Sequence, residues 1–187
     1  MYKQEFEYKV NQWTEWIQKE PMSRYDFALF KIWIQFENYL VKIFKDYCLG
    51  RKSAEGYEPK RQIIFVSEQQ LLALLRERGK EYLDYQEIIK NKSSYIFDVK
   101  ENPFNLVYTD RAFNDALSKI KAIRNYVAHE SGISLDKYMD ACLGTGPFVE
   151  PDEYLKQFKK KSKTTNYSFL TEKLKEIIVL LENPIFS

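Results

Sequence analysis

The sequence predicts an all-α fold, a bundle of about five or six helices in one domain over residues 1–187. Hydrophobic residues recur at intervals of three and four along several segments, which is the spacing of one face of an α-helix. The 187 residues include only 6 glycines and 6 prolines, whereas hydrophobic residues make up 44% and aromatic residues 16%. This composition favours a packed helical core over a turn-rich β-sandwich.

An amphipathic helix is predicted at the N-terminus, over 1–22. One face of it carries Phe6, Val10, Trp13 and Ile17. Pro21 is expected to stop it. The helix can pack on its own domain or on a partner.

The main bundle, 23–187, is predicted to open with a long helix over 24–49. Its wide apolar surface indicates contact with two or more neighbours. Glu37 falls within that surface, away from the polar stripe. Its carboxylate therefore needs a hydrogen bond or a cation, either as a structural acid or as part of a functional site.

The next part of the chain is predicted as a loop followed by two short helices. Residues 50–66 have the composition of a loop with basic ends. Ser67 and Gln70 form a plausible capping box, and Gly79 is a candidate C-cap for the same helix. A further short helix is expected to run to about Lys90.

Residues 92–105 do not give a single prediction. Tyr95, Phe97 and Val99 alternate as in a strand. A small hairpin or irregular insertion is therefore expected near 92–105.

Two more segments show helical periodicity. One helix is expected to start at Thr109 or Asp110 and to end at Gly132. After an amphipathic segment and a lysine run, the last helix is expected from about Asn166 and should end before Pro184.

The charge balance does not indicate a broadly basic nucleic-acid-binding surface. The chain has 29 Lys and Arg against 27 Asp and Glu, a formal net charge of +2. Any basic surface must come from local clusters. Two such clusters are Lys159, Lys160, Lys161 and Lys163, and Arg51, Lys52, Lys60 and Arg61.

The sequence offers no candidate residues for metal binding or redox chemistry. Cys48 and Cys142 have apolar neighbours, which is typical of reduced, buried thiols in a cytosolic protein. One histidine and two isolated cysteines offer no metal-ligand spacing, so neither a metal nor a cofactor is expected. The N-terminus lacks the apolar core of a signal peptide and no uncharged apolar run has bilayer length, which predicts a soluble, cytoplasmic protein without membrane contact.

His129 is the only histidine in the chain, and it follows Arg124 and Asn125 in the stretch Arg-Asn-x-x-x-His. An imidazole is the usual proton-transfer group near neutral pH, and an arginine supplies a permanent cation. On an ideal helix Arg124 points along the apolar stripe, and His129 lies about 140° away. Asn125 and His129 share a face, because they are four residues apart.

Each of these residues also has a structural interpretation. His129 alone could be a surface or capping residue, and Arg124 alone could form an internal salt bridge, for instance with Glu37. The 140° divergence leaves three ways to a common site: a distorted helix near Ala128, an arginine that reaches around, or a site formed across a dimer.

The stretch Arg124-Asn125-Tyr126-Val127-Ala128-His129, late in a helix of an all-α chain, resembles the R-x(4–6)-H motif of HEPN domains. In those domains a polar residue, often Asn, follows the arginine. The segments 36–40 and 47–50 are also similar to the first long helix of the family. The similarity extends over about 25–181, and the specific part of it is the six-residue motif.

The resemblance implies metal-independent RNA cleavage by a homodimer, as in toxins of toxin–antitoxin pairs and phage-defence factors. Arg124 and His129 would be the catalytic pair, with Asn125 in support. Glu37 is a further candidate supporting residue because of its place within an apolar surface. RNA would contact the basic clusters, namely Lys159, Lys160, Lys161, Lys163, Arg51 and Lys52. An antitoxin or another regulatory protein is a further expected partner. The alternative is a non-catalytic HEPN-like module that dimerises and binds a nucleotide, RNA or a protein.

Overall fold

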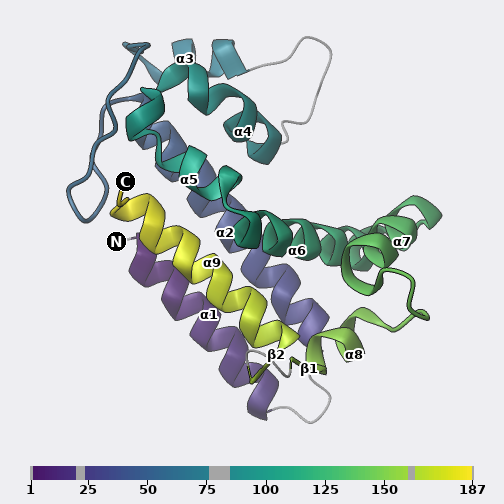
Figure 1. Cartoon of the computed structure of the whole chain (residues 1–187). Helices are drawn as coiled ribbons and strands as arrows, with labels where there is room; N and C mark the ends of the chain where they lie inside the picture. The colour runs from purple at the N-terminus through teal and green to yellow at the C-terminus, as the bar shows by residue number, and fades with distance from the viewer. Residues whose placement is uncertain (1, 20–23, 76–84, 160–162, 187) are drawn as a thin grey trace. The chain divides into compact units, whose positions relative to one another are not determined.

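The computed structural model describes residues 2–19, 24–75, 85–159 and 163–186, and this part of the chain is mostly helical (Figure 1). Its nine α-helices are α1 (Tyr2–Lys19), α2 (Tyr25–Cys48), α3 (Glu68–Leu75), α4 (Tyr85–Ile96), α5 (Pro103–Thr109), α6 (Arg111–His129), α7 (Gly132–Tyr138), α8 (Pro151–Lys156) and α9 (Asn166–Glu182). The all-α class is confirmed, with more helices in the described residues than the five or six expected. The additional helices are short, and the shortest have fewer than two helical turns.

The chain forms two compact units. We call the first the loop unit; it comprises 1–3, 37–110 and 177–187. We call the second the motif unit; it comprises 4–36 and 111–176. Helices α1, α2 and α9 each contribute residues to both units. The expectation of one domain over 1–187 stays a prediction.

Aromatic rings fill the core of the loop unit. Phe104 lies 5.4 Å from Phe44 and 5.8 Å from Phe97 between ring centroids, and all three side chains are buried. The predicted loop after α2 is confirmed. It is bonded to the end of α9, where Glu182 accepts hydrogen bonds from Ser53 and from the backbone of Ala54.

Of the two alternatives expected near 92–105, a hairpin or an irregular insertion, the hairpin is wrong. This segment comprises the end of α4, a short 3-10 turn η1 (Val99–Glu101) and α5. Asn102 caps α5 by accepting a hydrogen bond from the backbone N–H of Phe104, and Pro103 occupies the first turn, where no N–H is needed. Tyr95 and Val99 are exposed while Phe97 is buried, so the alternation comes from a helix end and a turn.

Most helix boundaries agree with the sequence. Ser67 accepts a hydrogen bond from the N–H of Gln70, which in turn accepts one from Val66 and completes the start of α3. Helix α4 continues to Ile96, beyond the Lys90 expected. Pro21 and Gly79 lie outside the described residues.

The motif unit is built on the predicted apolar faces of α1 and α2. Phe6, Val10 and Ile17 are buried, and Trp33 stacks on Phe36 with ring centroids 5.5 Å apart. The segment before α9 contains an antiparallel pair of short strands, β1 (Phe158–Lys159) and β2 (Thr164–Thr165), drawn beside α8 in Figure 1. The sequence did not predict this hairpin.

No helix in the described part of the chain is long and apolar enough to cross a membrane.

Candidate functional site

Helix α6 carries the Arg-Asn-x-x-x-His stretch at its C-terminal end. It is α-helical from Arg111 through His129, and its inner face buries Ala116, Leu117, Ile120, Ala122 and Ile123. Glu130 then leaves the helix with φ 44°, in the left-handed region. The helix therefore places Arg124, Asn125 and His129 within its last two turns.

The expectation that this helix ends at Gly132 is wrong, because Gly132 begins α7. Ser131 caps α7 by accepting a hydrogen bond from the N–H of Ser134, and the Ser134 hydroxyl accepts one from the N–H of Ser131. This capping box uses serine where the usual one uses glutamate or glutamine.

Arg124 is half-buried and is held by an amide and an aromatic ring. Its Nη1 donates to Oδ1 of Asn125 at 2.9 Å, and its guanidinium carbon lies 5.9 Å from the centroid of the Phe30 ring. Its Nε is buried and has no hydrogen-bond partner among the described residues. Within the same residues no carboxylate forms an ion pair with this guanidinium. The expected internal salt bridge is therefore not found there, and the cation retains capacity for an anion.

His129 is exposed at the last position of α6. In the described part of the chain its ring has no hydrogen-bond partner. Because α6 is regular through His129, the imidazole and the Arg124 guanidinium leave the helix about 140° apart. The structure therefore brings Arg124 and Asn125 together by a hydrogen bond, and His129 leaves the helix on another face than Arg124.

The last turn of α6 is packed against α7, which folds back from the end of α6 in Figure 1. The Tyr126 ring stacks on Tyr138 with centroids 5.5 Å apart and an interplanar angle of 7°. Phe148 contacts both rings edge-on, and the buried Tyr138 hydroxyl donates to the carbonyl of Val149. These contacts support the regular helix and oppose a distortion near Ala128.

A hollow of about 500 Å³ lies beside this turn, within the motif unit. Its walls include the aromatic side chains of Trp16, Phe27 and Tyr126, and the carboxylates Glu130 and Glu150. Burial raises the pKa of Tyr126, and the charges of Glu150 and Glu130 raise it further. Arg24 also lines the hollow, but it is paired with Asp26. Glu130 and Glu150 therefore leave an excess of negative charge that repels phosphate, so the hollow does not suit the backbone of a nucleic acid.

The predicted lysine run lies in the β1–β2 hairpin. Lys159 is half-buried, with Nζ 3.7 Å from the centroid of the Phe169 ring. Lys163 is exposed in the turn, has φ 53°, and donates its N–H to the carbonyl of Lys159. Lys160 and Lys161 lie outside the described residues.

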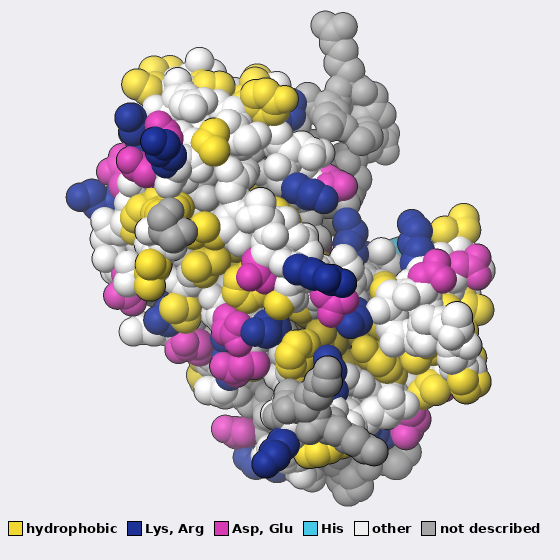
Figure 2. Space-filling model, in the orientation of Figure 1, with side chains coloured by type: hydrophobic (Ala, Val, Ile, Leu, Met, Phe, Trp, Pro, Cys, Tyr) yellow, Lys and Arg dark blue, Asp and Glu magenta, His cyan; other side chains and the backbone are white. Residues whose placement is uncertain are grey.

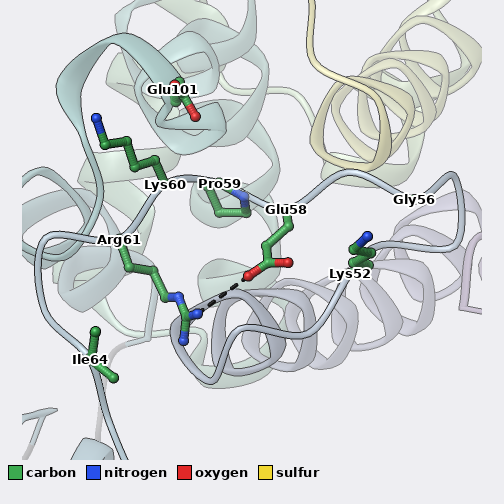
Figure 3. A pocket seen from close by; sticks show the side chains of 8 residues that line it. All are labelled: Lys52, Gly56, Glu58, Pro59, Lys60, Arg61, Ile64 and Glu101. Atoms are coloured by element: carbon green, nitrogen blue, oxygen red, sulfur yellow. Dashed lines mark hydrogen bonds and ion pairs between the residues drawn. The ribbon is translucent and has the colours of Figure 1, made fainter.

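The second predicted cluster belongs to the loop unit. Arg51 forms an ion pair with Asp46 at 2.9 Å. Lys52 lines an open pocket of about 570 Å³, together with Lys60 and Arg61 (Figure 3).

Carboxylates reduce the positive charge of this pocket. Figure 3 shows Arg61 directed at Glu58, to which it is bonded at 3.3 Å. Glu101 also lines the pocket, and Lys60 lies 3.7 Å from Asp98. The mixture of signs recurs on the face drawn in Figure 2, where basic and acidic side chains are interspersed.

Glu37 is half-buried in α2 and does have an interaction partner. Because it belongs to the loop unit and Arg124 to the motif unit, its supporting role stays a prediction.

The two cysteines are free thiols, with Cys48 fully buried and Cys142 half-buried. Burial raises the pKa of both. No group of three or more potential metal ligands occurs among the residues that the structure describes.

Three residues near these sites were not singled out from the sequence. Phe30 lies on α2 and meets Arg124 only through folding, so no local pattern identifies it. Lys119 and Lys173 have the periodicity of ordinary surface positions. In the structure Lys173 lies over the same Phe169 ring as Lys159, and the charge of Lys119 lowers the pKa of Lys159.

Comparisons with known proteins add no assignment: no protein-family model, curated protein or solved structure matches this chain.

Proposed function

We propose that this chain is a metal-independent endoribonuclease of the HEPN type that acts as a homodimer. Arg124 and His129 are the catalytic pair, and Asn125 supports the arginine. The observation that carries the proposal is the half-buried Arg124, which keeps an amide and a ring as partners but no carboxylate among the described residues. A buried structural arginine normally has an acid as its partner, whereas a phosphate-binding arginine must leave that position open.

The two groups have complementary roles in cleaving a phosphodiester. His129 accepts the proton of a ribose 2′-hydroxyl, whose oxygen forms a bond to the adjacent phosphorus. The bond from phosphorus to the 5′ oxygen breaks, and that oxygen takes up a proton. Arg124 stabilises the negative charge that builds on the phosphoryl oxygens. The products are a 2′,3′-cyclic phosphate and a 5′-hydroxyl, and DNA is resistant because it lacks the attacking group.

A dimer would accommodate the divergence of about 140° between the side chains of Arg124 and His129. Arg124 is engaged by Phe30 and Asn125, and α6 is undistorted at Ala128. These contacts disfavour a site within one copy, in which either the arginine must reach around or the helix must bend. In a two-fold dimer the exposed His129 of one copy approaches the Arg124 of the other, and symmetry produces two such sites.

Purified protein incubated with RNA in excess chelator tests the activity. The parent should cleave RNA, and His129→Ala should lose about 10²–10⁴ of the rate. Asp136→Asn, an exposed change on α7, is the matched control and should cleave like the parent. Equal inertness of parent and variant contradicts the nuclease and favours the non-catalytic module.

Mixing two inactive variants tests the composite site. Arg124→Ala and His129→Ala each inactivate their own homodimers, but a heterodimer of the two retains one intact site. Random exchange makes about half of the dimers heterodimers with one of two sites intact, so about a quarter of the parental activity should return. If both groups act from one copy, the mixture stays inactive.

The wider biology follows the same resemblance. A ribonuclease of this kind suits a toxin–antitoxin or phage-defence role, with a protein partner that silences or triggers it. Lys159, Lys163, Arg51 and Lys52 are the described candidates for holding RNA. Expression of the parent alone should arrest growth, and His129→Ala should relieve that arrest.

A further inference from the structure

Two lysines of the motif unit lie against two phenylalanine rings, and the charge of a third lysine acts on one of them. Lys159 of β1 has Nζ 3.7 Å from the Phe169 centroid. Lys173 of α9 has Nζ 5.9 Å from the same ring and 5.6 Å from that of Phe113. Lys119 of α6 lies close enough for its charge to lower the pKa of Lys159. We call these the three-lysine cluster.

The charges of the cluster are not balanced. Lys119 forms an ion pair with Asp115 at 2.6 Å, and Lys173 is paired with Glu176. Lys159 is the lysine of the cluster that no described carboxylate pairs with. Three cations face two acids, so the cluster carries an excess positive charge.

This arrangement disfavours the protonated form of Lys159. Burial lowers its pKa, the charge of Lys119 lowers it further, and Asp115 raises it in part. A half-buried ammonium next to a like charge is stabilised when an anion binds. The three ammonium groups offer several N–H donors, and the Phe169 and Phe113 rings offer apolar surface for a sugar or base.

We propose that the three-lysine cluster is a phosphate-binding subsite for single-stranded RNA, with Lys159 as its central cation. The inference rests on the proposed ribonuclease function, and it deepens that function by saying where the substrate backbone binds. Lys119 is ten residues before His129 on the same helix, about 15 Å along its axis. A strand held here reaches the catalytic turn within a few nucleotides.

The neighbouring charges also distinguish among the basic residues that were predicted to contact RNA. Arg51 is neutralised by Asp46, and the pocket beside Lys52 contains Glu58 and Glu101. Lys159 therefore has a stronger claim to a phosphate than either, and Lys119 and Lys173 join it although the sequence did not indicate them.

Binding of a labelled 2′-O-methyl RNA of about twelve nucleotides, measured by fluorescence anisotropy across a salt series, tests the subsite. This RNA cannot be cleaved, so the result does not depend on catalysis. Lys159→Gln should weaken binding several-fold and reduce the slope of log affinity against log salt by about 0.7. Lys119→Gln should weaken binding by less, because Asp115 already offsets part of the charge of Lys119. Lys100→Gln removes one exposed charge elsewhere and should leave both the affinity and the slope unchanged.

Variants that bind like the parent with the same slope overturn the subsite, as does a parent that does not bind the RNA. Lys159→Arg should retain binding, which separates the loss of charge from damage to the hairpin. Cleavage of ordinary RNA with unaltered binding by the glutamine variants sinks the subsite and leaves the nuclease. Binding that depends on Lys159, without cleavage, retains the subsite and removes the nuclease.

Discussion

Glu182 offers a quantitative test of how the loop unit is held together. Its side chain is 1% exposed at the C-terminal end of α9. One carboxylate oxygen accepts from the Tyr39 hydroxyl at 3.1 Å, and the other accepts from the N–H of Ala54 at 2.8 Å. Burial raises the pKa of Tyr39, and the charge of Glu182 raises it further, so the phenol remains a donor.

Replacing Glu182 with alanine removes both acceptors. A hydrogen bond to a charged group contributes about 1.5–3 kcal/mol, so the two bonds together contribute about 3–6 kcal/mol. The carboxylate also loses its own desolvation cost, which offsets part of the change. We therefore expect Glu182→Ala to lower the free energy of unfolding by about 3 kcal/mol.

Glu182→Gln is the matched control. The amide keeps the size of the side chain, accepts from Ala54 and donates to the Tyr39 oxygen, so the expected loss is about 1 kcal/mol. Urea unfolding measures both, and a double-mutant cycle with Tyr39→Phe should give a coupling of about 1–2 kcal/mol. A Glu182→Ala loss below about 0.5 kcal/mol, or no coupling, refutes this account.

Three further predictions concern the motif unit. Arg124→Ala should cost only about 1–2 kcal/mol in urea unfolding, from one hydrogen bond and one cation–π contact, while activity falls at least about 10²-fold; an unfolded variant would make Arg124 structural. Burial raises the pKa of Cys142 to about 12, so its alkylation at pH 8 should be on the order of 10³-fold slower in the folded chain than in urea; comparable rates contradict this. Burial likewise raises the pKa of Tyr167 to about 12. Its stabilising contribution is complete below about pH 10, the value for an unfolded tyrosine, and should be lost as pH rises towards 12. Tyrosinate absorbance in parallel with urea unfolding should show this loss, and a flat stability profile over that range counts against it.

The sequence predicted the long helices well because their apolar periodicity survives folding. The 140° divergence within α6 was available from the spacing of Arg124 and His129, and the buried and exposed positions agree with it. The contact of Arg124 with Phe30 could not be predicted from the sequence, because Phe30 is distant in the sequence and the contact is tertiary. An internal acid was the natural expectation for a cation on an apolar face.

The errors have local causes. Glycine often follows a helix end, which predicts an end at Gly132, but Glu130 adopts the left-handed conformation and Ser131 caps α7. The β1–β2 hairpin has two-residue strands, which are too short for alternation to be seen. The lysines of this segment are typical of a solvated surface, so they do not indicate a pair of strands.

The stacked rings of Tyr126 and Tyr138 keep the last turn of α6 straight, and this has a kinetic consequence on the proposed mechanism. A copy that cannot complete its own site is silent when it is alone. Below the dissociation constant of the dimer, turnover therefore rises with the square of protein concentration, so a tenfold dilution costs about a hundredfold in rate. A cell that held such a chain at low abundance would tolerate it and would face damage only after accumulation.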